Sequence, residues 1–304
     1  MRPTLRQLQY IVAIAETGRF HEAAKRLYVS QPSLSAQVAD VEAQLDVKLI
    51  ERGRHGAIMT PQGEEFVKRA RIILRSVEDL KSAMEAGATS LAGRIRLGVL
   101  PSVGPYLLPS VVKTLHRENP GLRLNVQEHR TLDLRTGLSD GSLDCVISAT
   151  EDHPDTGGAR LFEERLWICT ASDDVLAGTG PVAIDDLKGR DLLTVGSGHR
   201  FSLIVQQLAD RMGAFISTEY QGTSLDAVRQ MAATGAGVAI LPAMYALSEA
   251  RRDDDLVLRP IDHPLARRCV SLIWRSASPL ADRFEQIADV MRDAADALLV
   301  GDKS

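Results

Sequence analysis

Residues 23–35 read AAKRLYVSQPSLS, and this stretch decides the fold of the first part of the chain. A short helix containing the two alanines is predicted to end at Leu27. Ser30 and Pro32 then predict the start of another helix, because serine caps helices and proline fits their first turn. Two helices separated by so tight a turn are typical of a helix-turn-helix.

The residues on either side complete a pattern of three short helices. A first helix is predicted to end at Gly18, and a second helix is predicted from Phe20 to Leu27. The apolar positions of the first helix recur at spacings of three and four: Leu5, Leu8, Val12 and Ala15. The third helix has an apolar stripe of its own: Leu34, Val38, Val41 and Leu45.

The remaining surface of the third helix is small and mostly uncharged, whereas a helix that only faces water more often carries Lys and Glu. A slim face of this kind can enter the major groove of DNA, where Ser and Gln hydrogen-bond base edges or phosphates. The residues expected to contact DNA are Ser30, Gln31, Pro32, Ser33, Ser35 and Gln37.

The segment 49–61, LIERGRHGAIMTP, predicts a hairpin wing. Two short extended pieces flank a basic tip that contains glycine, and Arg52 and Arg54 are placed to meet phosphates or the minor groove. By itself such a segment is equally consistent with an ordinary solvated turn. Its position directly after a helix-turn-helix favours the wing.

A long helix is predicted to begin at residues 60–63, and its apolar positions alternate by four and three over about three heptads. An isolated helix would expose this seam to water, so the pattern predicts that two copies of the chain pair through it. The alternative is that the seam packs against the chain's own domain. The seam consists of Phe66, Ala70, Ile73, Val77, Leu80 and Met84.

From Arg94 onward, strands and helices are predicted to alternate, which indicates parallel sheets with right-handed crossovers. Two similar blocks predict two subdomains with a cleft between them. The expected strands are 95–100, 122–127, 143–147, 192–195, 217–221, 238–241 and 269–274. The expected helices are 106–117, 132–139, 201–212, 224–233 and 279–299.

Charge and composition are compatible with this scheme. The 304 residues have a net charge of −4, but residues 1–92 hold 13 Lys and Arg against 11 Asp and Glu, whereas the rest hold 23 against 29. This asymmetry permits DNA binding by the first part. We find no apolar run long enough for a bilayer and no signal peptide, so a cytoplasmic location without membrane contact is expected.

The chain has three cysteines, Cys145, Cys169 and Cys269, which are far apart and lie in apolar runs. An odd number without metal-ligand spacing predicts small buried side chains rather than a metal site, and no cofactor is expected.

Residues 23–35, continued by Glu42, Leu45, Leu49, Arg52, Thr60 and Gly63, resemble the LysR-type transcriptional regulators, and the resemblance covers essentially the whole chain. It implies an α plus α/β fold and an activator that binds double-stranded promoter DNA and a small effector. It also implies a homodimer or homotetramer, with RNA polymerase as a further partner.

The resemblance also implies where the domains lie. A winged helix-turn-helix is expected in 1–61, and a linker and dimerisation helix with a hinge in 62–92. A periplasmic-binding-protein-like effector domain is expected in 93–304. Its subdomain I would comprise about 93–165 and 269–304, and its subdomain II about 166–268.

Within the family, residues 98–109, GVLPSVGPYLLP, are similar to the peroxide regulators of the OxyR type. Those regulators carry a reactive cysteine directly after Gly-His and a resolving cysteine about nine residues later. Here Arg200 follows His199, and residues 206–210 contain no cysteine. A guanidinium cannot replace the thiolate that peroxide oxidises, so no such disulfide switch is expected. A peroxide-responsive activator with a different sensing site, including one of the three cysteines, remains the alternative.

The effector is expected at the carboxyl ends of the strands, where open α/β sheets bind ligands. The loops there offer hydroxyl groups and helix N-termini, which favour anions, and Arg200 could clamp a carboxylate. Arg200 could equally form a structural salt bridge or face solvent. The expected effector residues are Ser102, Thr131, Ala149, His199, Arg200, Thr223 and Ser224, of which Ser102, Thr131 and His199 match pocket positions of OxyR-type sensors.

Two other classes of function are disfavoured. Ser102, His199 and Asp226 could form a hydrolytic triad, but no Gly-x-Ser-x-Gly surrounds Ser102, so an enzyme is not expected. A solute-binding protein would leave the first 92 residues unexplained.

Overall fold

The computed structural model describes residues 3–53, 56–86, 91, 93–196, 200–218, 224–249 and 255–300, without the side chains of 52, 79, 82–86 and 200. The chain divides into two compact units, which we describe separately. The N-terminal unit comprises residues 1–93 and 136–143, and the C-terminal unit comprises 94–135 and 144–304.

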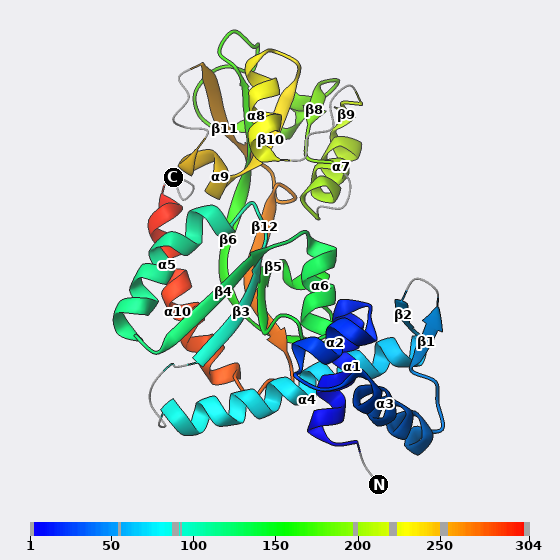
Figure 1. The fold of residues 1–304 in the computed structure, drawn as a ribbon. Coiled ribbons are helices and arrows are strands. Elements are labelled where there is room, and N and C mark those ends of the chain that lie inside the picture. The colour runs from blue at the N-terminus through cyan, green and yellow to red at the C-terminus, as the bar shows by residue number, and fades with distance from the viewer. Residues whose placement is uncertain are drawn as a thin grey trace. The chain divides into compact units, whose positions relative to one another are not determined.

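The N-terminal unit contains the predicted winged helix-turn-helix (Figure 1). Its elements are α1 (Leu5–Thr17), α2 (Phe20–Arg26), α3 (Gln31–Leu45), β1 (Ile50–Gly53), β2 (Gly56–Met59) and α4 (Pro61–Ala86). Thr4 and Gln7 form a capping box at the start of α1, and Gly18 ends the helix with a φ of 65°. A positive φ favours glycine, which explains why the helix stops where the sequence predicts.

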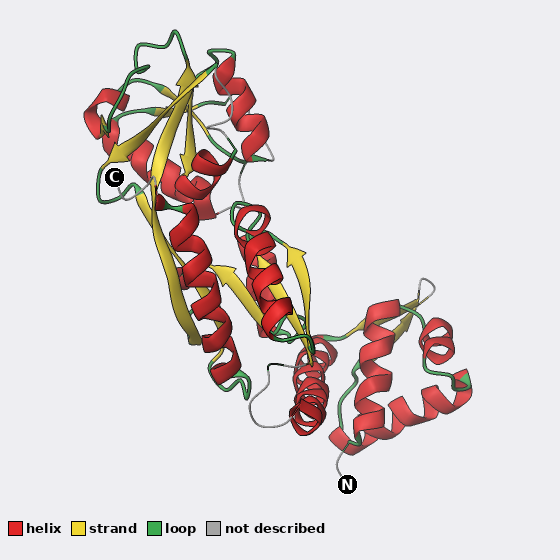
Figure 2. Ribbon diagram, turned by 90° about the vertical axis from the view of Figure 1, so that its left-hand side faces the viewer, coloured by secondary structure: helices red, strands yellow, loops and turns green. Residues whose placement is uncertain are grey.

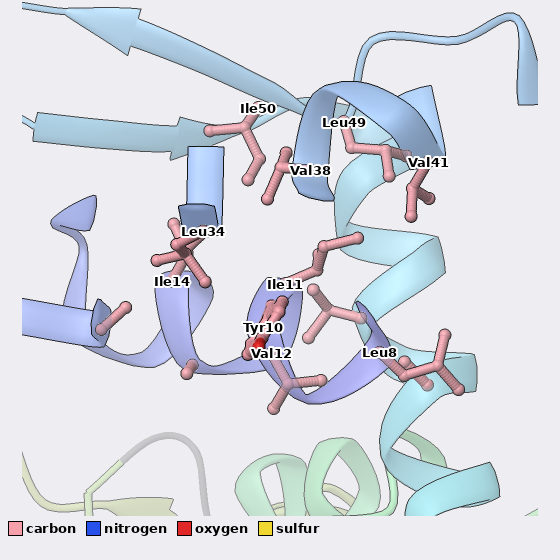
Figure 3. Packing of buried hydrophobic residues seen from close by; sticks show 14 of the residues in the cluster. Leu8, Tyr10, Ile11, Val12, Ile14, Leu34, Val38, Val41, Leu49 and Ile50 are labelled. Atoms are coloured by element: carbon pink, nitrogen blue, oxygen red, sulfur yellow. The ribbon is translucent and has the colours of Figure 1, made fainter. Parts of the chain in front are cut away.

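The core of this unit forms where the apolar stripes of α1 and α3 meet (Figure 3). Ile11 and Ile14 of α1 are fully buried, as is Leu34 of α3, and all three belong to one cluster. The predicted stripe of α3 is wrong at Leu45, which is exposed. Leu45 is the last residue of α3, directly before the C-cap Asp46.

The hairpin wing is present: β1 and β2 pair antiparallel from Ile50 opposite Met59 to Gly53 opposite Gly56. Gly56 has a φ of 130°, and a Cβ there would lie 2.4 Å from the carbonyl oxygen of Gly18. A side chain at this position would therefore clash with backbone. Arg54 and the side chain of Arg52 lie outside the described residues.

Glu42 joins α3 to the wing. Its Oε1 accepts hydrogen bonds from the N–H groups of Leu49 (2.9 Å) and Ile50 (3.1 Å), and Lys48 Nζ lies 2.9 Å from Oε2. Burial alone would raise the pKa of this carboxyl, but these three partners outweigh it, so the pKa is lowered from 4.5. The charged form is therefore stabilised by folding.

We expect this joint to weaken in acid. Because the folded-state pKa of Glu42 is depressed, its contribution to stability is fully present above the unfolded pKa and is lost as the pH falls through the folded value. Hydrogen-exchange protection of the Leu49 and Ile50 amides should therefore fall with acidification. In Glu42→Gln, protection should be lower at neutral pH, and protection that is unchanged there would contradict the assignment.

The beginning of α4 packs inside the N-terminal unit rather than forming a free seam. Ala70 is buried in the core cluster, and Phe66 packs against it. Ala70 is therefore covered by its own domain, whereas the pairing of two chains through the rest of the seam, including partly buried Phe66, stays a prediction. Further along, Ile73, Val77 and Leu80 are exposed, Leu80 by 62%. The side chain of Met84 lies outside the described residues.

The C-terminal unit has two subdomains, and in each the helices flank a sheet (Figure 2). The elements of subdomain I are β3 (Gly93–Val99), α5 (Gly104–Glu118), β4 (Leu122–Glu128), α6 (Thr131–Ser139), β5 (Cys145–Ser148), the short helix Thr150–Asp152 and α10 (Ala281–Leu298). Only the first five residues of α6 belong to the C-terminal unit, because residues 136–143 are grouped with the N-terminal unit. Those of subdomain II are β7 (Val182–Ala183), the short helix Ile184–Leu187, β8 (Asp191–Leu193), α7 (Arg200–Met212), β9 (Phe215–Ile216), α8 (Leu225–Ala233), β10 (Val238–Pro242), α9 (Ala243–Ser248) and β11 (Leu256–Asp262).

Two long strands connect the subdomains: β6 (Thr156–Ala171) and β12 (Arg267–Arg275). Residues 156–165 of β6 pair with β12, except Leu161 at a register shift, and residues after Arg165 pair with β10 and β11. The prediction of parallel sheets is confirmed only in part. β3 with β5 and β8 with β10 pair parallel, as predicted. β12 pairs antiparallel with β5 and β6, and β10 and β11 pair antiparallel with β6, so the sheet is mixed. Four elements were not predicted from the sequence: β6, β7, β11 and α9. The strand β9 begins two residues earlier than predicted.

None of the described helices is long and apolar enough to cross a membrane.

Candidate functional site

The exposed surface of α3 carries the residues expected to bind DNA. Gln31, Pro32, Ser33 and Gln37 are exposed, and Ser35 is half-buried. Ser30 is the N-cap, and its Oγ accepts the N–H of Ser33 at 3.3 Å. The capping bond leaves the Ser30 O–H as a donor, and the helix N-terminus adds partial positive charge. This surface is therefore suited to phosphate and base contacts.

A cavity of about 250 Å³ lies in the C-terminal unit, at loops that follow strands and at the first turns of helices. The loop before α5 and the first residues of α6, α7 and α8 all contribute to its wall. The lining residues are Leu100, Pro101, Ser102, Pro105, Tyr106, Glu128, Thr131, Ala149, Val195, Phe201, Ile204, Ser224, Leu225, Asp226, Tyr245, Arg268 and Val270.

Four of the seven expected effector residues line this cavity: Ser102, Thr131, Ala149 and Ser224. His199, Thr223 and the side chain of Arg200 lie outside the described residues. Arg200 is the first residue of α7, and its neighbour Phe201 belongs to the lining.

Thr131 presents an unsatisfied hydroxyl to the cavity. The residue is 7% exposed, and its Oγ1 has no hydrogen-bond partner among the described residues. It begins α6, whose first backbone N–H groups lack partners within the helix. Leaving a buried hydroxyl unpaired costs about 1–3 kcal/mol, which a ligand with a hydrogen-bonding group would recover.

Arg268, the cation of the described lining, was not predicted from the sequence. Its Nε donates to Glu164 Oε1 at 2.6 Å, and its Nη1 donates to Ser102 Oγ at 3.0 Å. Because Ser102 Oγ accepts from Arg268, its own O–H is available for an acceptor on a ligand. The sequence did contain a sign of this residue, because Arg267 and Arg268 directly precede an apolar strand. Side chains alternate between the two faces of a strand, so one of two successive arginines must point inward.

Two tyrosines face each other in the wall. The rings of Tyr106 and Tyr245 meet edge to face with centroids 5.8 Å apart, and the Tyr245 hydroxyl donates to Asp226 Oδ1 at 2.6 Å. Burial, with the nearby carboxylates of Asp226, Glu249 and Glu128, raises the pKa of Tyr106 to about 12. Burial and the bond to Asp226 also raise the pKa of Tyr245. Both phenols therefore remain protonated donors.

Cys269 cannot form a disulfide with Cys145 or with Cys169 in this arrangement. Cys145 lies opposite Trp274 of β12, five residues from Cys269, which is about 17 Å along a strand. Cys269 lies opposite Glu163 of β6, six residues or about 20 Å from Cys169. A disulfide needs Cα atoms within about 7 Å. Burial raises the pKa of the Cys145 thiol, which keeps it protonated and unreactive.

Comparison with known proteins identifies the family. The bacterial regulatory helix-turn-helix protein of the lysR family matches residues 5–64, and the LysR substrate binding domain matches residues 88–296. This chain belongs to the LysR family. It is therefore a DNA-binding transcription regulator of LysR type, and the family consists of regulators rather than enzymes.

The similar LysR regulators include proteins of the OxyR type. The DNA-binding transcriptional dual regulator OxyR of Escherichia coli K12 is 36% identical over 293 residues, 96% of each chain. A full-length cysteine-to-aspartate mutant of OxyR from Pseudomonas aeruginosa superposes with a TM-score of 0.78 at 31% identity, covering 96% of this chain and 98% of that one. A hydrogen-peroxide-bound cysteine-to-serine mutant from Corynebacterium glutamicum gives a TM-score of 0.67 at 32% identity, covering 99% and 96%.

Proposed function

We propose that this LysR regulator is controlled by a small organic anion that binds in the cavity of the C-terminal unit. The unsatisfied hydroxyl of buried Thr131 carries this proposal. Ser102, polarised by Arg268, and the N-terminus of α6 supply further donors for one anionic group. We assign Arg200 as a further clamp, with Ala149, His199, Thr223 and Ser224 completing the site.

The charges of the lining limit the kind of anion. Glu128 and Asp226 are carboxylates, and Arg268 is already paired with Glu164. A ligand with one anionic group and an apolar body therefore suits the cavity better than a dianion, because further negative charge would be repelled. The aliphatic and aromatic remainder of the lining supports the same choice.

We expect titration calorimetry to locate the anion with a panel of aromatic and aliphatic monocarboxylates. Thr131→Val should weaken the best binder about tenfold, and Arg200→Ala by roughly 10- to 100-fold, because hydrogen bonds to charged groups contribute about 1.5–3 kcal/mol. Thr194→Val is the matched control, since Thr194 Oγ1 is also buried and without a partner among the described residues but does not line the cavity. Equal affinities for the wild type, the two site variants and the control would refute the proposed effector site.

At the DNA end, we propose that α3 contacts the operator through Ser30, Gln31, Pro32, Ser33, Ser35 and Gln37. Arg52 and Arg54 of the wing would contact the backbone or minor groove. We further propose that exposed Ile73, Val77 and Leu80, together with Met84, pair two chains. We also propose that the protein is a cytoplasmic tetramer that contacts RNA polymerase. Its domains would comprise residues 1–61, 62–92 and 93–304.

A peroxide-responsive activator is the second candidate, because a similar OxyR structure holds hydrogen peroxide. Treating the protein with peroxide and mapping its thiols by mass spectrometry tests a cysteine switch. We expect no disulfide within the chain, and labelling confined at first to Cys269, which is only half-buried. A disulfide formed at stoichiometric peroxide, together with altered operator binding, would favour the second candidate over the anion.

A further inference from the structure

A buried ion pair lies where the chain passes between its two subdomains. Glu164 of β6 and Arg268 of β12 are direct cross-strand partners, and their side chains are 0% and 6% exposed. The chain enters subdomain II along β6 just after Glu164, and it returns to subdomain I just before Arg268. Both crossings of the chain are therefore joined by this buried pair of charges.

The same pair binds groups on both sides of the crossing. Glu164 Oε2 accepts the backbone N–H of Met244, at 2.6 Å, from α9, which follows β10 of subdomain II. Arg268 Nη1 donates to Ser102 Oγ in the loop before α5 of subdomain I. The guanidinium also lies 5.8 Å from the ring centroid of Phe201 on α7 of subdomain II.

Stability alone does not explain such a pair. Removing two charges from water costs several kcal/mol per ion, so well-packed apolar residues often stabilise a fold as much or more. A charged pair is directional whereas an apolar contact is not, because its hydrogen bonds form only in one relative orientation of the two groups. Here those groups belong to two bodies whose angle could otherwise vary.

We propose that Glu164 and Arg268 form a latch that fixes the angle between subdomains I and II, with Ser102 linking the latch to the cavity. Ser102 lines the cavity and accepts from Arg268, so a ligand bound to its O–H favours one state of the latch. A ligand shifts an equilibrium only by binding its two states unequally, and this shared hydroxyl supplies such a difference. This link to the cavity rests on the proposed effector site, whereas the latch itself does not.

Pulsed electron paramagnetic resonance can measure the angle without any ligand. Nitroxides on Lys113→Cys of α5 and Gln230→Cys of α8, both exposed, report the distance between subdomains. All labelled variants also carry Cys269→Ser, so that this half-buried cysteine is not labelled. Mixing with an excess of unlabelled protein suppresses distances between nitroxides on different chains. The test variants are Glu164→Gln, the apolar pair Glu164→Leu with Arg268→Met, and Ser102→Ala.

The matched control is the ion pair of Glu163 and Arg267, one residue away on the same two strands but exposed, with 3.2 Å between the charged groups. We expect the distance distribution to shift or broaden beyond the wild-type width in Glu164→Gln and in the apolar pair, and less in Ser102→Ala. Glu163→Gln with Arg267→Met should leave it unchanged.

A second readout is the affinity of the unliganded protein for a duplex from the region upstream of its own gene. Loss of the latch should change this affinity by about fivefold or more, in the range of allosteric couplings. If Glu164→Gln does not fold, the apolar pair decides, because it leaves no unpaired buried charge.

A folded apolar pair with wild-type distances would overturn the latch, and an unaltered Ser102→Ala would overturn its link to the cavity. The calorimetry of Thr131→Val is independent of these distances. The two proposals can therefore fail separately. The latch can be confirmed when no carboxylate binds, and carboxylate binding can be confirmed when the latch is absent.

Discussion

Replacing Ser33 by glutamate is expected to lower operator affinity by about a hundredfold. Ser33 is exposed at the third position of α3, on the surface that we assign to DNA. A carboxylate there would face phosphates and the acceptor atoms of bases, and an unpaired charge in an interface costs about 3 kcal/mol. Binding to a labelled operator duplex, followed by fluorescence anisotropy at fixed salt, measures the effect.

Misfolding would not account for that loss. Ser30 is the N-cap of α3, so a glutamate at position 33 completes the Ser-x-x-Glu pattern of a capping box and should stabilise the helix. The control is Gln230→Glu on α8, which makes the same change in net charge at an exposed position of the C-terminal unit. We expect this control to bind nearly as wild type. Wild-type affinity in Ser33→Glu would remove α3 from the DNA interface.

The second large effect concerns stability. Glu164→Leu leaves the buried guanidinium of Arg268 without its carboxylate, and we expect the free energy of unfolding of the C-terminal unit to fall by about 3–5 kcal/mol. Domains are stable by only about 5–15 kcal/mol, so this loss is a large share of the total. Adding Arg268→Met should restore the part of the loss that arises from the unpaired charge. The Met244 N–H, which donates to Glu164 in the wild type, still lacks this acceptor in both variants.

The chain provides a selective probe for this measurement. Its two tryptophans, Trp167 and Trp274, lie on β6 and β12, so tryptophan fluorescence in a urea titration follows the C-terminal unit. Glu163→Leu is the control at an exposed position of the same strand, and it should change stability by less than about 0.5 kcal/mol. A single Glu164→Leu variant as stable as wild type would show that solvent reaches Arg268.

The sequence predicted most of the secondary structure because its signals are local. Ser30 caps the helix that begins at the next residue, and Gly18 ends α1 through its own backbone angle. The family resemblance was equally local, since it rested on runs such as residues 23–35. Four of the seven expected effector residues line the cavity for a related reason: they follow strands, and strand ends converge in a parallel sheet.

The same local reasoning failed wherever burial depends on distant parts of the chain. Ala70 fits a dimer seam by spacing, but the core of its own unit covers it. Strand β6 was missed because it pairs with strands of both subdomains, and its partners lie 70 to 119 residues further along the chain. Periodicity within β6 carries no information about which sheet covers which face.

The sequence by itself therefore determined the winged helix-turn-helix, the alternation of strands and helices, and the strand ends that line the cavity. Only the tertiary structure placed Arg268 against Glu164 and Ser102, which are 104 and 166 residues distant in the chain. Caps and periodic stripes depend on neighbours within a helical turn, so they can be read residue by residue. A buried ion pair depends on how two strands cross, and that crossing is set by the packing of the whole unit.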